Sequence, residues 1–310
     1  MLSRIAESLY WIGRLVERAE DTARLLDVHV SVLLEDTSAV EADMCRQVIA
    51  ALGVADPSDA PPTTQRLLEI AAYDPASAIC GALATARENA RTVREVISSE
   101  MWEALNTTRN ALPAQRNRAR RAGPHEFFSF VKQRTALVSG LADTTMSRDE
   151  GWYFLVLGRS LERVDMTVRI LSLGRAVGDT QAASVALLRS CGAFEAYLRT
   201  YRGTVATRQA AEFLLLDRLF PRSVFSALSE AEQALRHLTP RSAGRTGTAE
   251  PGLIALGRAR TSLEFADSAS TVSDLPAQLG RLQRACVDTA DAISERFFDR
   301  QGTITWVTGR

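Results

Sequence analysis

The sequence is poor in the residues from which metal sites, disulfide frameworks and nucleophilic catalytic sites are built. It has three histidines and four cysteines in 310 residues, and all of them are scattered, with no Cys-x-x-Cys pair. A zinc site or a disulfide framework needs clustered ligands or a small secreted chain. Carboxylate metal sites in helical bundles usually contain Glu-x-x-His, which is absent here. We therefore expect isolated thiols and no bound metal.

Several other signals are also missing. There is no glycine-rich phosphate loop and no Gly-x-Ser-x-Gly elbow, so no cofactor and no serine nucleophile are expected. The 37 basic and 37 acidic residues balance, which argues against a nucleic-acid partner. No stretch approaches the roughly 20 apolar residues of a membrane-spanning helix. Glu7 and Arg14 interrupt the apolar run that a signal peptide would need. These absences predict a cytoplasmic protein without a membrane partner.

Apolar residues recur with helical spacing along nearly the whole chain. In the first segment they follow each other at three and four residues from about Ser3 to Leu34, which draws one apolar stripe on a helix. Capping boxes at Ser38–Glu41 and Ser147–Glu150 open two further helices. A short helix is expected to end at Asp74-Pro75, and another helix is expected to contain Phe127, Phe128 and Phe130. The remaining expected helices cover about 77–111, 180–201, 205–217, 222–238, 252–268 and 275–299.

Three segments are expected to lie outside these helices. They are the loop Pro113–Pro124 with its four arginines, the loop Thr239–Gly252, and the strand-like tail Thr303–Thr308, which is too short to define a sheet. An arginine cluster in a loop is usually solvated rather than bound to nucleic acid. The expected fold class is all-α, a helical bundle.

The chain also contains an internal repeat. Residues 13–26 and 158–171 are offset by 145 and are identical at seven of fourteen positions, where chance would give about one. The same offset superimposes Ile79, Leu83, Ala86 and Arg91 on Val224, Leu228, Ala231 and Arg236. We predict a single domain, 1–310, with tandem repeats 1–145 and 146–300 that are related by a pseudo-twofold axis.

Each repeat carries a charged helix face. The residues are Arg14, Glu17 and Arg18 in the first copy and Arg159, Glu162 and Arg163 in the second, with the aromatic side chains Tyr10, Trp11 and Trp152 nearby. Arginines four residues apart destabilise a helix slightly unless something pairs with them. One interpretation is a solvated face, or ion pairs of Arg14 and Arg18 with Glu162 and of Arg159 and Arg163 with Glu17. The other is a cleft in which these nine side chains bind a carboxylate or phosphate.

No catalytic residue is assigned, because arginine neighbours lower the pKa of a glutamate and so suit an ion pair better than an acid. The segments Trp11–Glu20 and Leu157–Arg163 resemble the paired Glu-Arg motifs of the bacterial alpha-E family. Segments 87–105, 147–152, 211–217 and 220–224 also resemble that family, although Asp165 stands where the first copy has Glu20.

The resemblance implies an all-helical protein of a largely uncharacterised family. Genes of that family commonly neighbour, or are fused to, a circularly permuted ATP-grasp ligase, and often a transglutaminase-like protease. This context implies an accessory or substrate-binding component of a peptide synthesis or modification system, with a peptide or an acidic group as ligand. Two alternatives stay open. One is an enzyme of the same pathway with Glu17 or Glu162 as acid or base, and the other is a purely structural scaffold.

Overall fold

The protein is described by a computed structural model that covers residues 1–33, 38–56, 58–177, 180–239, 250–266 and 274–298. Over these residues it is all-helical and has no strand, so the expected all-α fold class is confirmed. The helices are α1 Ser3–Leu33, α2 Ser38–Leu52, α3 Thr64–Leu68, α4 Cys80–Thr92, α5 Ser99–Ala122, α6 His125–Thr145, α7 Glu150–Val177, α8 Gln181–Ser190, α9 Phe194–Tyr201, α10 Thr207–Leu216, α11 Val224–Leu238, α12 Pro251–Glu264 and α14 Leu275–Ile293, with π-helical turns η1 Glu69–Tyr73 and η2 Ser294–Phe298.

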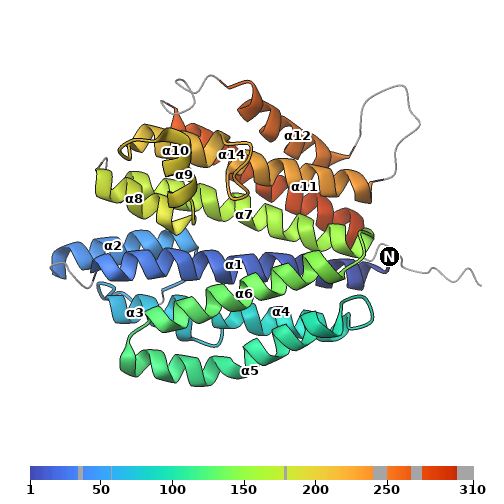
Figure 1. Ribbon diagram of the computed structural model, residues 1–310, viewed down its shortest axis with the longest axis horizontal. Helices are drawn as coiled ribbons and strands as arrows, with labels where there is room; N and C mark the ends of the chain where they lie inside the picture. Colours follow the sequence, from blue (N-terminus) through green and yellow to red (C-terminus); the bar gives the residue numbers. More distant parts are fainter. Residues whose placement is uncertain (34–37, 57, 178–179, 240–249, 267–273, 299–310) are drawn as a thin grey trace, which may run out of the picture.

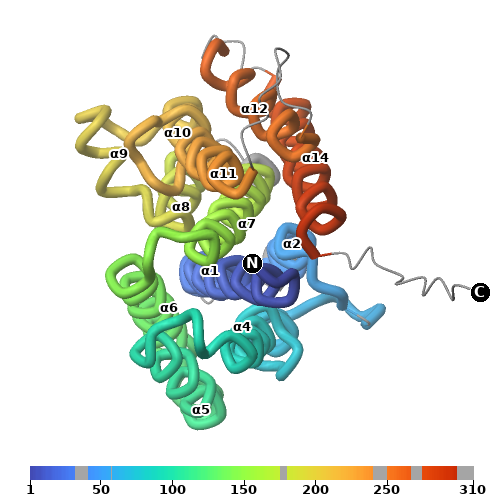
Figure 2. The backbone as a smooth tube through the Cα atoms, turned by 90° about the vertical axis from the view of Figure 1, so that its right-hand side faces the viewer, coloured from blue at the N-terminus to red at the C-terminus, as the bar shows by residue number. Residues whose placement is uncertain are grey.

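The two longest helices, α1 and α7, pack against each other at the centre of the bundle (Figures 1 and 2). Helices α4 and α6 cover α1 on one side, and α5 packs outside them. On the other side, α11 and α14 cover α7, and α12 packs outside them. Further contacts cross the centre, since α8 and η2 pack on α1 and α2 packs on α7.

Helix α1 is buried around most of its circumference because it lies between these groups of helices. Its apolar stripe is in the core, where Leu9, Ala19 and Ala23 are fully buried. The opposite, charged side is buried at Glu17, which is 1% exposed, whereas Glu7 and Arg18 reach solvent. The interpretation of this face as solvated is therefore wrong for its glutamate.

Two expectations in the first half of the chain are wrong. The single helix expected over 77–111 is broken between α4 and α5, where the Ser98 hydroxyl caps α5 by accepting from the Met101 amide. The loop expected at Pro113–Pro124 is helical, because α5 continues through Pro113 to Ala122 and ends at Gly123, with φ 97°. Pro113 has no N–H to donate within the helix. The helix on both sides of it is held by buried Leu112 and Ala119 and by contacts of its arginines.

The arginines of this segment tie α5 to its neighbours. Arg116 donates to the Tyr73 carbonyl at 2.8 Å, and Arg120 donates to Glu69 at 2.5 Å. Arg118 forms an exposed ion pair with Glu126 at the start of α6. Two of the four arginines thus hold the second half of α5 against η1, which the loop interpretation did not foresee.

The helix expected over 180–201 is also divided. Helix α8 ends before Gly192, whose φ of 62° is a left-handed conformation that glycine adopts without strain, and α9 begins at Phe194. Most of the expected loop at 239–252 and the whole strand-like tail at 303–308 lie outside the described residues. None of the described helices combines the length and the apolar character that crossing a membrane would require.

Candidate functional site

Glu162 on α7 is buried and accepts hydrogen bonds from two arginines of α1. Arg14 Nε donates to Oε2 at 2.7 Å. Arg18 donates through Nε to Oε1 at 2.5 Å and through Nη2 to Oε2 at 3.2 Å. The Glu162 side chain is 0% exposed. Charge-assisted bonds of this kind are among the strongest in proteins, so this carboxylate joins α7 to α1.

Glu17 on α1 is bound in the same manner from the other side. Arg163 on α7 donates to its two oxygens through Nε at 2.8 Å and Nη2 at 2.9 Å, and Arg222 Nη1 lies 2.9 Å from Oε1. Burial alone would raise the pKa of Glu17, but Arg222 and Arg163 outweigh it and lower this pKa to about 2. The Glu17 carboxyl is therefore ionised at physiological pH and has no proton to donate.

The internal repeat relates these two sets of ion pairs. Adding 145 to the number of a residue in α1 gives its counterpart in α7. Arg18 bonds to Glu162, and Arg163, its counterpart, bonds to Glu17, the counterpart of Glu162. The pairings of Arg14, Arg18 and Arg163 are those given by the ion-pair interpretation of the sequence. The two Glu-Arg motifs are thus brought together, each supplying the acid for the other's arginine.

The backbones of α1 and α7 also meet in a reciprocal way. A Cβ atom on Gly13 would lie 2.1 Å from the Leu155 carbonyl oxygen, and one on Gly158 would lie 2.0 Å from the Tyr10 carbonyl oxygen. Both distances are far below van der Waals contact, so only glycine allows the helices to approach this closely. The same offset of 145 relates the two contacts.

Arg222, in the loop before α11, is a functional-site candidate that sequence reasoning missed. Besides Glu17, it pairs with Glu20 through Nη2 at 2.7 Å and with Asp21 through Nη1. Burial, together with the carboxylates of Glu17 and Glu20, raises the pKa of Asp21 to about 8, although Arg222 opposes the shift. The signal available in the sequence was the segment 220–224, but no charge partner could be assigned to it without the fold.

Arg159 has different partners from those expected. The sequence suggests a pair with Glu17, but Arg159 Nη1 lies 3.2 Å from Asp143 at the end of α6, and Nη2 lies 3.4 Å from Glu230 on α11. This expectation is wrong because Arg159 is one helical turn before Arg163, next to α6 and α11. The Glu230 carboxylate also accepts from the Ser160 hydroxyl at 2.7 Å and lies 3.7 Å from Arg163 Nη1.

The three aromatic candidates are packing residues in this structure. Tyr10 is buried against Trp11 and Phe298, and its hydroxyl accepts from Arg14 Nη1 at 3.2 Å. Trp152 is half-buried near the start of α7, with the Arg148 guanidinium 3.9 Å from its ring centroid. Neither Tyr10 nor Trp152 lines the groove beside Arg18.

A groove of about 530 Å³ opens beside Arg18, between α1, the end of α2 and the start of α4. The Arg18 side chain is 37% exposed there, whereas its counterpart Arg163 is 12% exposed. The groove is lined by Leu15, Arg18, Leu52, Gly53, Val54, Pro75, Ala76, Ser77, Ala78, Gly81, Ala82, Ala84 and Thr85. Arg18 is therefore the arginine of the two motifs that is most accessible to a ligand.

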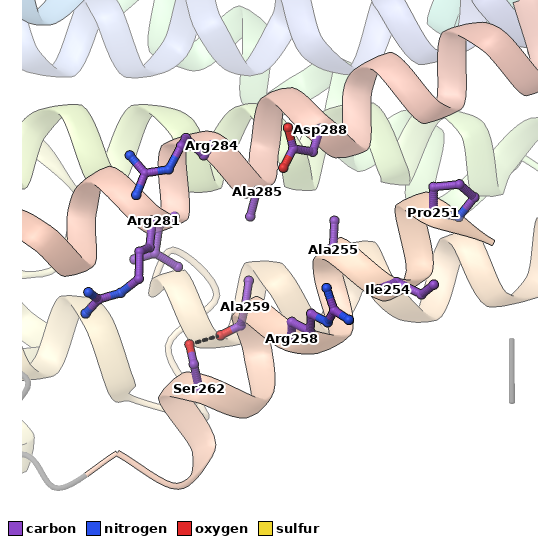
Figure 3. Close-up of a pocket in the computed structure, with 11 residues that line it drawn as sticks. Pro251, Ile254, Ala255, Arg258, Ala259, Ser262, Arg281, Arg284, Ala285 and Asp288 are labelled. Carbon is purple, nitrogen blue, oxygen red and sulfur yellow. Dashed lines mark hydrogen bonds between the residues drawn. The ribbon is translucent and has the colours of Figure 1, made fainter. Parts of the chain in front are cut away.

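A second groove, of about 620 Å³, lies between α12 and α14 at the outer edge of the bundle (Figures 1 and 3). Its apolar lining includes Ile254 and Ala285, and Arg258, Arg281 and Arg284 also line it. Among the described residues, neither Arg258 nor Arg284 forms an ion pair. This groove contains none of the residues predicted from the sequence.

Other site chemistry finds little support. Within the part of the chain that the structure describes, no group of three or more His, Cys, Asp or Glu side chains could hold a metal ion. All four cysteines are buried, and burial raises the pKa of Cys191 and Cys286 to about 12. Thiols with such pKa values stay protonated and are poor nucleophiles.

Comparison with known proteins agrees with the paired motifs. Residues 1–298 match the Alpha-E family, described as a predicted alpha-helical domain with a conserved ER motif, and the chain belongs to this family. It is 27% identical over 278 residues to an uncharacterised protein of Mycobacterium bovis and to one of Mycobacterium tuberculosis strain CDC 1551, and 26% identical to one of strain H37Rv. Each alignment covers 80% of this chain and 31% of the relative, so the chain spans about a third of the relatives' length. No solved structure matches the chain.

Proposed function

We propose that this protein is a non-catalytic binding component of a system that forms amide bonds with ATP, and that it acts beside an ATP-grasp ligase. The observation that carries the proposal is the reciprocal use of the two motif glutamates. Glu17 and Glu162 are at most 1% exposed, and arginines of the opposite helix occupy both oxygens of each. A general acid or base needs a proton or a free lone pair within reach of a substrate. These glutamates offer neither, so we place the motif in the architecture and the binding function on its exposed rim.

The architecture that we propose is a tandem duplication, with repeats 1–145 and 146–300 related by a pseudo-twofold axis. Two observations support it. The helices fall in the same order with nearly the same offset, so that α1, α2, α3, α4, α5 and α6 correspond to α7, α8, α10, α11, α12 and α14. The contacts across the centre also correspond, because α8 packs on α1 as α2 packs on α7. In this view the Glu-Arg pairs fasten the two halves together.

The partner is proposed from the family resemblance and from the length of the relatives. In the mycobacterial proteins the matching segment is 31% of the chain, so there it is part of a polypeptide about three times as long. A segment that is covalently joined to other sequence in its relatives is suited to work next to another protein. We propose an ATP-grasp ligase, with a transglutaminase-like protein as a further partner. A partner that consumes ATP would place the complex in the cytoplasm.

The test is co-purification of the protein with an ATP-grasp ligase of the kind that the family resemblance implies, taken from the same genome, followed by coupled ATP turnover. The wild type should form a complex and raise the ligase's turnover of ATP in the presence of its acceptor. Arg18→Gln alters the exposed rim and should lower turnover several-fold while circular dichroism stays unchanged. Arg258→Gln, which removes an arginine from the α12–α14 groove, is the matched control. A wild type that neither binds the ligase nor changes its turnover would overturn the proposal.

The enzyme alternative predicts a different result for substitutions of the motif glutamates. If Glu17 or Glu162 were an acid or base, Glu→Gln at either position would abolish turnover in a protein that still folds. Our proposal predicts instead that both variants have a lower free energy of unfolding, and that any loss of turnover follows from this loss of stability. Turnover that disappears in a variant with unchanged unfolding free energy would favour the enzyme alternative.

A further inference from the structure

One difference between the two halves lies at the groove beside Arg18. In the second half, Arg222 and Glu230 fill the space next to Arg163, since both lie within 4 Å of Glu17 or Arg163. The loop Pro221-Arg222-Ser223 before α11 corresponds by its Pro-x-Ser pattern to Pro75-Ala76-Ser77 before α4. In both loops the serine hydroxyl accepts from the amide three residues later, which caps the following turn. This loop is offset by 146 rather than 145, because the first half has one more residue, Ala78, between the serine and the aligned helix. By the Pro-x-Ser pattern, Ala76 stands where the second half has Arg222.

The acidic residue is also missing from the first half. The offset of 145 that aligns α4 with α11 places Thr85 at the position of Glu230. Both Ala76 and Thr85 line the groove beside Arg18. The first half thus has a cavity of about 530 Å³ at the place where the second half has two charged side chains.

The charges around Glu162 do not balance. Arg14 and Arg18 both pair with this single carboxylate, which leaves one positive charge in excess. The neighbouring Arg169 is paired with Asp165 at 2.8 Å and so adds no net charge. Arg18 donates through Nε and Nη2 to Glu162, and among the described residues its Nη1 donates to no protein atom. The excess charge therefore has a free donor at the groove.

We infer that this groove binds one carboxylate, carried by a small molecule or a peptide end that also has an apolar group. The inference rests on the proposed binding function and names its ligand class. The ligand's carboxylate would lie beside Arg18 as the Glu230 carboxylate lies beside Arg163, 3.7 Å from Nη1. One excess positive charge matches a monoanion better than a phosphate dianion.

The rest of the groove suits an apolar group of limited size. Leu15, Leu52 and Val54 supply apolar surface, and the wall formed by Ala78, Gly81 and Ala82 leaves room because these side chains are small. A volume of about 530 Å³ is within the usual range for small-molecule sites.

The experiment is a titration of the full chain with N-acetyl-leucine, its neutral amide and inorganic phosphate, followed by ligand-observed NMR. A ligand of this size should bind with a Kd of about 1 mM. The amide and phosphate should bind at least about tenfold more weakly. Equal binding of the amide would overturn the inference, and so would tighter binding of phosphate, since either would exclude recognition of a single carboxylate.

Substitution at Thr85 tests the location. Thr85→Glu places a carboxylate where the second half has Glu230 and should weaken the binding of N-acetyl-leucine at least about tenfold. Thr85→Val keeps the size without charge and should leave the Kd within about twofold. Undiminished binding by Thr85→Glu would overturn the assignment to this groove.

The two proposals fail in different ways. If the wild type binds no carboxylate probe but still forms a complex with the ligase, the groove inference is wrong and the proposed function stands. If the probe binds in the expected manner but the ligase does not associate, the proposed function is wrong.

Discussion

Gly13 on α1 faces the carbonyl oxygen of Leu155 on α7, where a Cβ atom would lie 2.1 Å away. Gly158 faces the Tyr10 carbonyl in the same way, at 2.0 Å. The obstructing atoms belong to helix backbones, which cannot turn aside as a flexible side chain can. The close approach sets the spacing of α1 and α7, and with it the distance over which the arginines reach the opposite glutamates.

Gly13→Ala and Gly158→Ala should therefore destabilise the protein by about 2–3 kcal/mol each, because the helices must move apart. A loss of stability would be the opposite of the usual effect, since alanine normally stabilises a helix by about 1 kcal/mol relative to glycine. The measurement is the free energy of unfolding in urea, with the slope checked for two-state behaviour.

Gly140 on α6 is the matched control for these variants. It is also in a helix, but a Cβ atom there would meet nothing within 4 Å. Gly140→Ala should stabilise the protein by about 0.5–1 kcal/mol. If Gly13→Ala stabilised the protein as well, the close approach of the two backbones would be disproved.

The low pKa of Glu17 predicts how stability depends on pH. Its folded-state pKa of about 2 is below the ordinary 4.5 of glutamate, so its contribution is present above pH 4.5 and is lost as the pH falls from 4.5 to 2. The shift corresponds to about 3 kcal/mol. Glu17→Gln should be much less stable than the wild type at pH 7, and the gap should narrow as the pH falls below 4.5.

Urea unfolding at pH 7, 5, 4 and 3 measures this gap directly. The other carboxylates are present in both proteins, but Asp21 shares Arg222 with Glu17 and its pKa depends on the Glu17 charge, so the narrowing reports Glu17 together with its arginines and Asp21. A gap of constant size from pH 7 to pH 3 would contradict the assignment of the low pKa to Glu17.

Much of this arrangement could be predicted from the sequence, because its cause is local periodicity. The first residues of α1 and α2 follow from apolar spacing and from the capping box at Ser38–Glu41, and the structure begins these helices at Ser3 and Ser38. The pairing of Arg14 and Arg18 with Glu162 is one of the interpretations that the repeat allows, because two similar charged faces that meet can place acid against base.

The remaining features depend on tertiary contacts that no spacing reveals. Helix α5 passes through Pro113, and beyond it Arg116 and Arg120 contact η1. Arg222 reaches Glu17 from a loop more than two hundred residues away in sequence, and Arg159 turns to α6 and α11. The groove could not be predicted from the sequence either. It lies where Ala76 and Thr85 replace the larger charged side chains of Arg222 and Glu230 in the second half.

The burial of Glu162 predicts a large cost for removing its charge. Glu162→Gln leaves Arg14 and Arg18 without a carboxylate in a protein interior, and breaking such a pair from one side costs about 3–5 kcal/mol. Glu230→Gln is the matched control, because Glu230 also binds two arginines but is 37% exposed. Its cost should be about 1 kcal/mol or less. Equal losses of unfolding free energy in the two variants, measured by urea unfolding, would show that burial does not increase the contribution of Glu162 to stability.

Thr85→Glu should make the protein more stable, in contrast to the other substitutions near the motifs. The new carboxylate would lie beside Arg18 and balance the one excess positive charge around Glu162. Because Arg18 is 37% exposed, the gain should be that of a partly solvated ion pair, about 0.5 kcal/mol, and should shrink at high salt.

The measurement is the free energy of unfolding of Thr85→Glu and Thr85→Val in low salt and in about 1 M salt, where charges are screened within about 3 Å. Thr85→Val controls for the loss of the hydroxyl. A gain in Thr85→Glu that is absent in Thr85→Val and disappears in high salt shows that Arg18 attracts an anion. A loss of stability in low salt would show instead that the surroundings of Arg18 are already neutral, and the groove would then have no charge with which to hold a carboxylate.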